Sequence, residues 1–314
     1  MSGAARHFAA APSAQFPRWR RTWTRMRRNH IGFVVCALGP ILALFVIIRI
    51  YPIIETIRLS FYNYNITQRR NPFIGFANYI RLFDDDPFRT ALLNTIGFSV
   101  LSVIVTLVLA LGIAILLRSI EHTAPTFELL FYIPVVIPWV PAAVIWKWIY
   151  DPAYGALNYV LSGAGIPRLG WLQQPHLILY AIVGVSVWKL VGYFIVIYGV
   201  GLRSIPEELL EAADLDGATP RQKVVHIVLP LLRPIILFTV VTCTIICFNV
   251  FAPVYVLTAS SQGAPAYDFK VVVGEIYQNG FVFYHMGYAG AQCVVVLVFV
   301  MSLLAVQFLA FREK

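Results

Sequence analysis

The side chains of this sequence that could catalyse a reaction or bind a metal are few and scattered. Its six histidines lie in tails and loops without metal-ligand spacing, and its four cysteines all fall inside apolar runs, typical of small buried side chains. The triplet Asp84-Asp85-Asp86 before Pro87 is typical of a solvated acidic turn. No glycine-rich loop ending in Lys-Ser or Lys-Thr occurs. We therefore predict no catalytic residue, no metal site and no ATPase site on this chain.

Ionisable side chains inside apolar segments are better candidates for functional residues, because an unpaired charge in lipid is costly and is kept only where it has a role. Lys189 follows Trp188 in the middle of a long apolar run, with Tyr193 one turn further on. It fits either a substrate cavity or a structural contact with a charge or a carbonyl group. Lys147 is flanked by two tryptophans, which is typical of an interfacial belt with a lysine that reaches to the membrane surface.

Amide and phenol groups in other apolar runs extend this candidate set. Hydrogen bonding between helices explains the amides as well as substrate contact does. Aromatic rings stack on the apolar faces of a sugar while amides bond its hydroxyl groups, so the set suits a neutral sugar. An anionic substrate, such as a sugar acid or glycerol phosphate, would use Lys189 as its counter-charge. Both substrate classes stay open, and the predicted substrate path comprises Trp188, Lys189, Tyr193, Asn249, Tyr255 and Gln292.

The elements that must position these residues are membrane-spanning helices. Of the 314 residues, 59% are apolar and only 12% are charged, with a mean hydropathy of +0.75. Runs of about twenty apolar residues are long enough to cross a bilayer as a helix. We predict an all-α membrane protein with six transmembrane helices, of which the third carries three prolines and is kinked or broken. The predicted spans are Ile31–Ile54, Leu93–Leu117, Leu129–Ile149, Leu177–Leu202, Pro234–Leu257 and Met286–Phe311.

The basic residues indicate the orientation. The net charge of +9 does not suggest nucleic acid, because seven of the 24 Lys and Arg residues lie in the first thirty positions and the others mostly flank apolar spans. Fourteen lie in segments assigned to the cytoplasm and seven in outer segments, and the positive-inside rule then puts both termini in the cytoplasm. Residues 1–30 are interpreted as a retained, basic cytoplasmic tail and residues 31–311 as the transmembrane domain.

The longest charged segment between two apolar spans is residues 204–234, which we interpret as two short helices joined at a glycine. Ser204 and Glu207 have the spacing of a capping box. Gly217 stands where a helix would stop in a left-handed conformation. Thr219 precedes Pro220 as the cap of a second helix, which we expect to end at Pro230.

This loop resembles the EAA loop of permease subunits of binding-protein-dependent ABC importers. The motif has an EAA triplet, a DGA triplet and an I-x-L-P ending at fixed spacing, here Glu211, Ala212, Ala213, Asp216, Gly217, Ile227, Leu229 and Pro230. The outer loops are similar to the sugar-permease branch of the family, with F-x-G-x-x-N-Y at 73–79 and W-L-x-x-P at 171–175. One departure is Gly263-Ala264-Pro265, where that branch has Gly-Gly-Pro.

The resemblance implies a type I ABC importer permease fold in which residues 204–230 form the cytoplasmic coupling helices. It also implies a homologous second permease subunit, an ABC ATPase dimer that holds ATP and Mg, an extracytoplasmic solute-binding protein and a site in the bacterial cytoplasmic (inner) membrane. The expected function is ATP-driven import of a sugar, oligosaccharide, polyol or sugar acid. The alternative is an ATP-independent secondary transporter or channel, for which broken helices in the membrane would speak.

Overall fold

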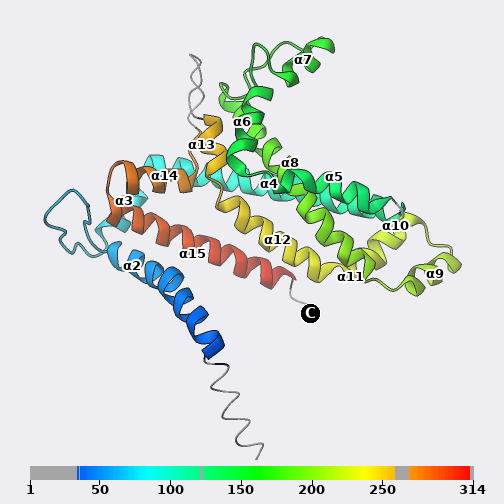
Figure 1. Cartoon of the computed structure of the whole chain (residues 1–314), viewed down its shortest axis with the longest axis horizontal. Coiled ribbons are helices and arrows are strands. Elements are labelled where there is room, and N and C mark those ends of the chain that lie inside the picture. Colours follow the sequence, from blue (N-terminus) through cyan, green and yellow to red (C-terminus); the bar gives the residue numbers. More distant parts are fainter. Residues whose placement is uncertain (1–33, 35, 121–122, 259–268, 312–314) are drawn as a thin grey trace, which may run out of the picture. The chain divides into compact units, whose positions relative to one another are not determined.

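The computed structural model describes residue 34 and residues 36–120, 123–258 and 269–311 (Figure 1). The predicted tail of residues 1–30 and the loop at 262–265 lie outside the described residues. The chain divides into two compact units, Met1–Glu55 and Thr56–Lys314. Within the described residues every regular element is a helix, which confirms the all-α prediction.

Four of these helices are long and apolar enough to cross a membrane by themselves. They run over Cys36–Leu59, Asp86–Arg118, Pro175–Arg203 and Met286–Phe311, the last three being α4, α8 and α15. The first contains the π-turn η1 (Val46–Ile50) and α2 (Tyr51–Leu59), and it ends at Leu59, five residues later than the predicted Ile54. With each bent helix pair counted as one span, the described residues offer up to six spans.

The third predicted span is broken, as its prolines indicate. Helix α5 (Ala124–Val136) and helix α6 (Trp139–Ile149) meet at an angle of 97°. Ile137 and Pro138 between them have extended backbone, with ψ of 127° and 150°. Proline removes a hydrogen-bond donor and disfavours helical backbone in the residue before it. The pair Ile137-Pro138 therefore ends one helix and starts the next.

The fifth predicted span, Pro234–Leu257, is not continuous, which corrects the prediction. Helix α12 (Arg233–Phe248) stops at Asn249, and helix α13 (Ala252–Thr258) starts three residues later. The physical reason is Pro253, whose nitrogen has no hydrogen to donate to the carbonyl of Asn249 in a continuing helix.

Helix α8 is the central helix of the second unit. Two thirds of its most apolar stretch is buried (67%), against 33% for α4, on which it packs. Helix α5 also lies along α8 (Figure 1). Their backbones approach so closely at Gly192 that a Cβ atom there would lie 1.9 Å from the carbonyl oxygen of Phe131. On its other side, the Tyr198 hydroxyl lies 2.7 Å from the Thr239 hydroxyl of α12.

The sugar-permease motifs of the two loops organise those loops. In the first, the Asn78 amide donates to the carbonyl oxygens of Ser60 (2.8 Å) and Tyr62 (3.0 Å), and Gly75 has a positive φ of 57°. In the second, the Asn158 side chain donates to the carbonyl of Leu169 (2.9 Å) and accepts from the Trp171 indole (3.1 Å). These hydrogen bonds fix the shapes of the two loops.

The remaining helices are short. The acidic triplet contributes a helix cap, because the Asp85 carboxylate accepts from Phe88 N (3.0 Å) at the start of α4. The short elements are α3 (Ala77–Phe83), α7 (Ala156–Gly163), α9 (Glu207–Leu215), α10 (Pro220–Lys223), η2 (Val224–Val228), α11 (Leu229–Leu231), α14 (Val272–Tyr277) and η3 (Gln278–Val282).

Candidate functional site: an intramembrane cavity and the 204–230 loop

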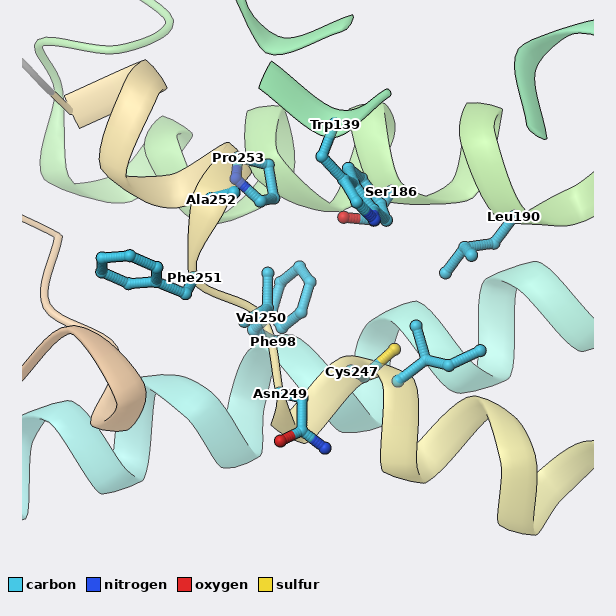
Figure 2. A pocket seen from close by; sticks show the side chains of 11 residues that line it. Phe98, Trp139, Ser186, Leu190, Cys247, Asn249, Val250, Phe251, Ala252 and Pro253 are labelled. Carbon is cyan, nitrogen blue, oxygen red and sulfur yellow. The ribbon is translucent and has the colours of Figure 1, made fainter. Parts of the chain in front are cut away.

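A cavity of about 230 Å³ lies where the two broken spans meet α8 and α4 (Figure 2). Its walls come from α4, α6, α8, α12 and α13 and from the break between α12 and α13. Figure 2 shows Trp139 and Ser186 facing Phe98 and Val250 across the cavity. Among the described residues that line it, none is charged. The lining residues are Phe98, Trp139, Ser186, Leu190, Ile246, Cys247, Asn249, Val250, Phe251, Ala252 and Pro253.

The polar groups of this cavity are few. Asn249 is exposed, and its amide nitrogen donates to Ile245 O (2.7 Å). The Ser186 hydroxyl is buried and has no hydrogen-bond partner among the described residues. A buried hydroxyl without a partner costs about 1–3 kcal/mol, which a bound hydroxyl or amide group would recover. Aromatic walls with two separated hydrogen-bonding groups are the usual lining of a site for a small polar, uncharged ligand.

The structure brings only one of the six predicted path residues, Asn249, into this cavity. Tyr255 lines a separate cavity of about 50 Å³, which shares Phe251 with the first. The Trp188 ring packs on Trp146 at 5.5 Å between centroids. Gln292 is fully buried and accepts from the Asn279 amide at 3.4 Å, as the interhelical alternative expects.

Tyr193, the fifth of these six residues, is half-buried, and its ring contacts that of Phe194 at 5.1 Å between centroids. Lys189 is only 5% exposed and turns toward the break between α5 and α6. Its ammonium group donates to Pro134 O (3.0 Å), to Val135 O (3.2 Å) and to Ile137 O. The same nitrogen lies 5.0 Å from the centre of the Trp139 ring. This is the carbonyl contact that the sequence left open for this lysine.

Lys147 in α6 also contacts a carbonyl group. Its ammonium group donates to Val256 O of α13 at 3.2 Å. The bond connects the second halves of the two broken spans, α6 and α13, which pack on each other.

Sequence reasoning missed Trp139, Cys247 and Phe251 as cavity residues. The positions of the prolines could have indicated them, because Pro138 and Pro253 mark the two helix breaks next to which these residues lie. Residues next to a break in a membrane helix are candidates for a cavity lining, since irregular backbone at membrane depth must be buried in protein or line a cavity.

The 204–230 loop lies at the end of the helices remote from α3 and α14 (Figure 1). It contains two helical pieces joined at Gly217, whose φ of 75° confirms the predicted left-handed stop. Thr219 caps the second piece in a capping box with Gln222, and Pro220 is its first residue. An ion pair of 2.5 Å between Lys223 and Asp214 connects the two pieces.

Two local predictions for this loop were wrong. Ser204 does not cap α9, because its hydroxyl donates to Gly201 O (2.7 Å) at the end of α8, and α9 begins only after Pro206. The second piece does not end at Pro230 but continues to Leu231, before a bend of 70° into α12. The π-turn η2 lies directly before Leu229 and Pro230, where the ring nitrogen has no hydrogen to donate.

The residues of the EAA motif are largely solvent-exposed. Glu211, Ala212, Asp216, Gly217 and Pro230 are exposed, while Ala213, Ile227 and Leu229 are half-buried. Leu215, between the two triplets, is 90% exposed. Around the glycine lies an open cleft of about 300 Å³, lined by Asp216, Gly217, Ala218, Gln222, Lys223, His226 and Ile227. Leu215 and the cleft leave the surface around Gly217 accessible to a partner.

Comparison with known proteins identifies the family. Residues 121–312 match the family model described as "Binding-protein-dependent transport system inner membrane component". The chain belongs to this family. It is a multi-pass membrane permease of the ABC importer class, as the resemblance of its 204–230 loop implied.

Relatives and solved structures cover nearly the whole permease. It is 34% identical over 284 residues to the probable ABC transporter permease protein YurN of Bacillus subtilis, covering 89% of this chain and 94% of that one. It is 31% identical to the sulfoquinovosyl glycerol transport system permease protein SmoG of Agrobacterium fabrum, covering 96% of each. Its fold matches a chain of a bacterial ABC transporter involved in the import of alginate, with a TM-score of 0.79, 24% identity and 93% and 98% coverage.

Proposed function

We propose that this permease is the transmembrane subunit of a carbohydrate importer and moves a neutral sugar or oligosaccharide through the cavity at Asn249. The observation that carries the proposal is this uncharged, aromatic cavity inside a permease fold. Sugar rings stack on aromatic faces, while their hydroxyl groups need donors and acceptors such as Asn249 and Ser186. The diacetylchitobiose permease NgcF of Streptomyces coelicolor is named for a neutral saccharide, whereas SmoG of Agrobacterium fabrum is named for sulfoquinovosyl glycerol, a sugar glycoside with an anionic sulfonate. Both names support carbohydrate transport.

The preference for a neutral substrate rests on the position of Lys189. This lysine is the basic side chain nearest in sequence to the cavity walls of α8, and its three hydrogens point to backbone carbonyls. An ammonium group has only three donors, so none is left for a carboxylate or phosphate. Polyols and neutral saccharides fit this lining better than sugar acids or glycerol phosphate.

The energy for transport comes, in this proposal, from a partner ATPase dimer that carries ATP and Mg. The exposed motif residues of the 204–230 loop support docking of that subunit, because Leu215 and the adjacent cleft offer an apolar and a polar contact side by side. The loop follows α8 directly, and α8 contributes Ser186 and Leu190 to the cavity wall. Movement of the docked loop therefore reaches the cavity through one continuous helix.

The complete importer would contain a homologous second permease, which closes the path from the other side, and an extracytoplasmic solute-binding protein. The charge distribution supports cytoplasmic termini and a cytoplasmic 204–230 loop. Residues 31–311 would form the transmembrane domain and residues 1–30 a cytoplasmic tail.

The proposal is tested by ATP hydrolysis of the reconstituted complex across a panel of neutral disaccharides, polyols and uronic-acid sugars, each presented with the binding protein. Stimulation by neutral saccharides alone is expected. Stimulation by acidic sugars alone would refute the substrate class, and hydrolysis that no saccharide changes would refute the carbohydrate assignment.

The alternative from the sequence was an ATP-independent secondary transporter, a class that also uses broken helices like those at Ile137-Pro138 and after Asn249. The match of residues 121–312 to an ABC importer family argues against it. The exposed coupling motif has no purpose in that class. Purification of the permease from its native membrane with a nucleotide-hydrolysing subunit attached would exclude it, and purification as a self-sufficient transporter would support it.

A further inference from the structure

The break between α5 and α6 leaves backbone carbonyls without their helical partners. In a continuous helix Pro134 O would accept from the nitrogen of residue 138, and Ile137 O from that of residue 141. Both of those residues, Pro138 and Pro141, are prolines and have no hydrogen on the nitrogen. Unsatisfied carbonyl groups at membrane depth cost several kcal/mol each.

Lys189 supplies the missing donors from the neighbouring helix. Its ammonium group contacts Pro134 O, Val135 O and Ile137 O, so three hydrogens meet three acceptors. The positive charge lies at the carboxyl end of α5, where the helix dipole is negative. One turn along α8, Gly192 lets the two backbones approach closely enough for a lysine side chain to reach them.

The same ammonium group contacts the cavity wall. Its nitrogen lies 5.0 Å from the centre of the Trp139 ring, and Trp139 is the first residue of α6 and lines the cavity. A cation over an indole ring is attracted to the negative face of the ring. Ser186, three residues before Lys189 on α8, lines the cavity as well.

We propose that Lys189 is a positioning residue. Its hydrogen bonds to the end of α5 fix the geometry of the α5–α6 break and thereby hold Trp139 in the cavity wall, and Lys189 does not contact substrate itself. The proposal deepens the proposed function, since it concerns the shape of the same cavity. It differs from a counter-charge role in one measurable respect. Removal of a positioning residue changes access to the cavity for all probes alike, whereas removal of a counter-charge changes it according to probe charge.

The test uses the assembled importer with the four native cysteines replaced by alanine and a reporter cysteine introduced by Asn249→Cys. Labelling rates are measured with one neutral, one anionic and one cationic thiol reagent. In Lys189→Met, all three rates are expected to rise by about three- to tenfold together, because the charged hydrogen bonds that hold the wall are lost. In Lys189→Arg, which keeps a charged donor, the labelling rates are expected to stay closer to those of the parent protein.

Trp139→Leu provides the second, independent variant and leaves Lys189 in place. It is expected to raise the three rates by a similar factor, and the double variant is expected to add little, because both changes act on one wall. Unchanged rates in Trp139→Leu, or a change in Lys189→Met confined to the anionic or the cationic reagent, would overturn the proposal. If Lys189→Met fails to assemble, Lys189→Gln takes its place, and its three labelling rates are expected to rise together; rates equal to those of the parent would overturn the proposal. The readout needs no transported substrate, so its failure is separate from failure of the carbohydrate assignment.

Discussion

Replacement of Gly192 by alanine should loosen the contact between α5 and α8. The added Cβ would lie 1.9 Å from the oxygen and 2.5 Å from the carbon of the Phe131 carbonyl group. An ordinary C···O contact is about 3.3 Å, so the two backbones must separate by roughly 1 Å or more. Such overpacking costs about 1–3 kcal/mol, while alanine returns about 0.5–1 kcal/mol of helix propensity.

A matched control is Gly112→Ala in α4, where a Cβ atom meets nothing within 4 Å. This variant should only gain stability, by the helix propensity of alanine, without any steric cost. The two variants should therefore differ by about 1–3 kcal/mol in unfolding free energy, or roughly several degrees in melting temperature at about 2–4 °C per kcal/mol. The assay is thermal unfolding of the purified complex in detergent. Equal melting temperatures for the two variants would refute the close-packing argument at Gly192.

Two further predictions concern the 204–230 loop. The variants Glu211→Ala and Gly217→Pro should insert into the membrane normally but uncouple transport from ATP hydrolysis or weaken retention of the ATPase. The reason is that proline cannot adopt the φ of 75° at position 217, and that Glu211 is exposed to a partner. Normal transport by both variants would show that the loop does not dock. A cysteine at Thr219 should resist a membrane-impermeant reagent added outside intact cells but react in inverted vesicles, because the distribution of basic residues predicts a cytoplasmic loop. Robust labelling from outside would reverse the topology.

Much of the fold could be predicted because membrane helices carry a strong signal. Apolar length located α8 and α15 to within two residues, and Gly217 and Thr219 marked the loop geometry through backbone rules that act locally. The break after Asn249 was missed, although Pro253 signals it, since an apolar run does not reveal whether its helix is continuous.

The candidate site was harder to predict because it depends on contacts between distant segments. Lys189 was identified as unusual from its position in an apolar run, but its acceptors lie at the end of α5 and in the break that follows it, more than fifty residues away. Ser204 shows the opposite case, since its spacing to Glu207 fits a capping box but its hydroxyl bonds within α8. Which of two local hydrogen bonds forms is decided by where the preceding helix ends.

The central claim is that the 204–230 loop transmits nucleotide binding to the cavity at Asn249. The most direct measurement is the accessibility of a cysteine at position 249 from each side of the membrane, in vesicles holding the complete importer, with and without nucleotide trapped on the ATPase. The account predicts that trapping lowers labelling from the ATPase side, raises it from the opposite side, and does neither in Gly217→Pro. Labelling rates that do not change when nucleotide is trapped, or that change equally in Gly217→Pro, would contradict the claim that the loop transmits nucleotide binding.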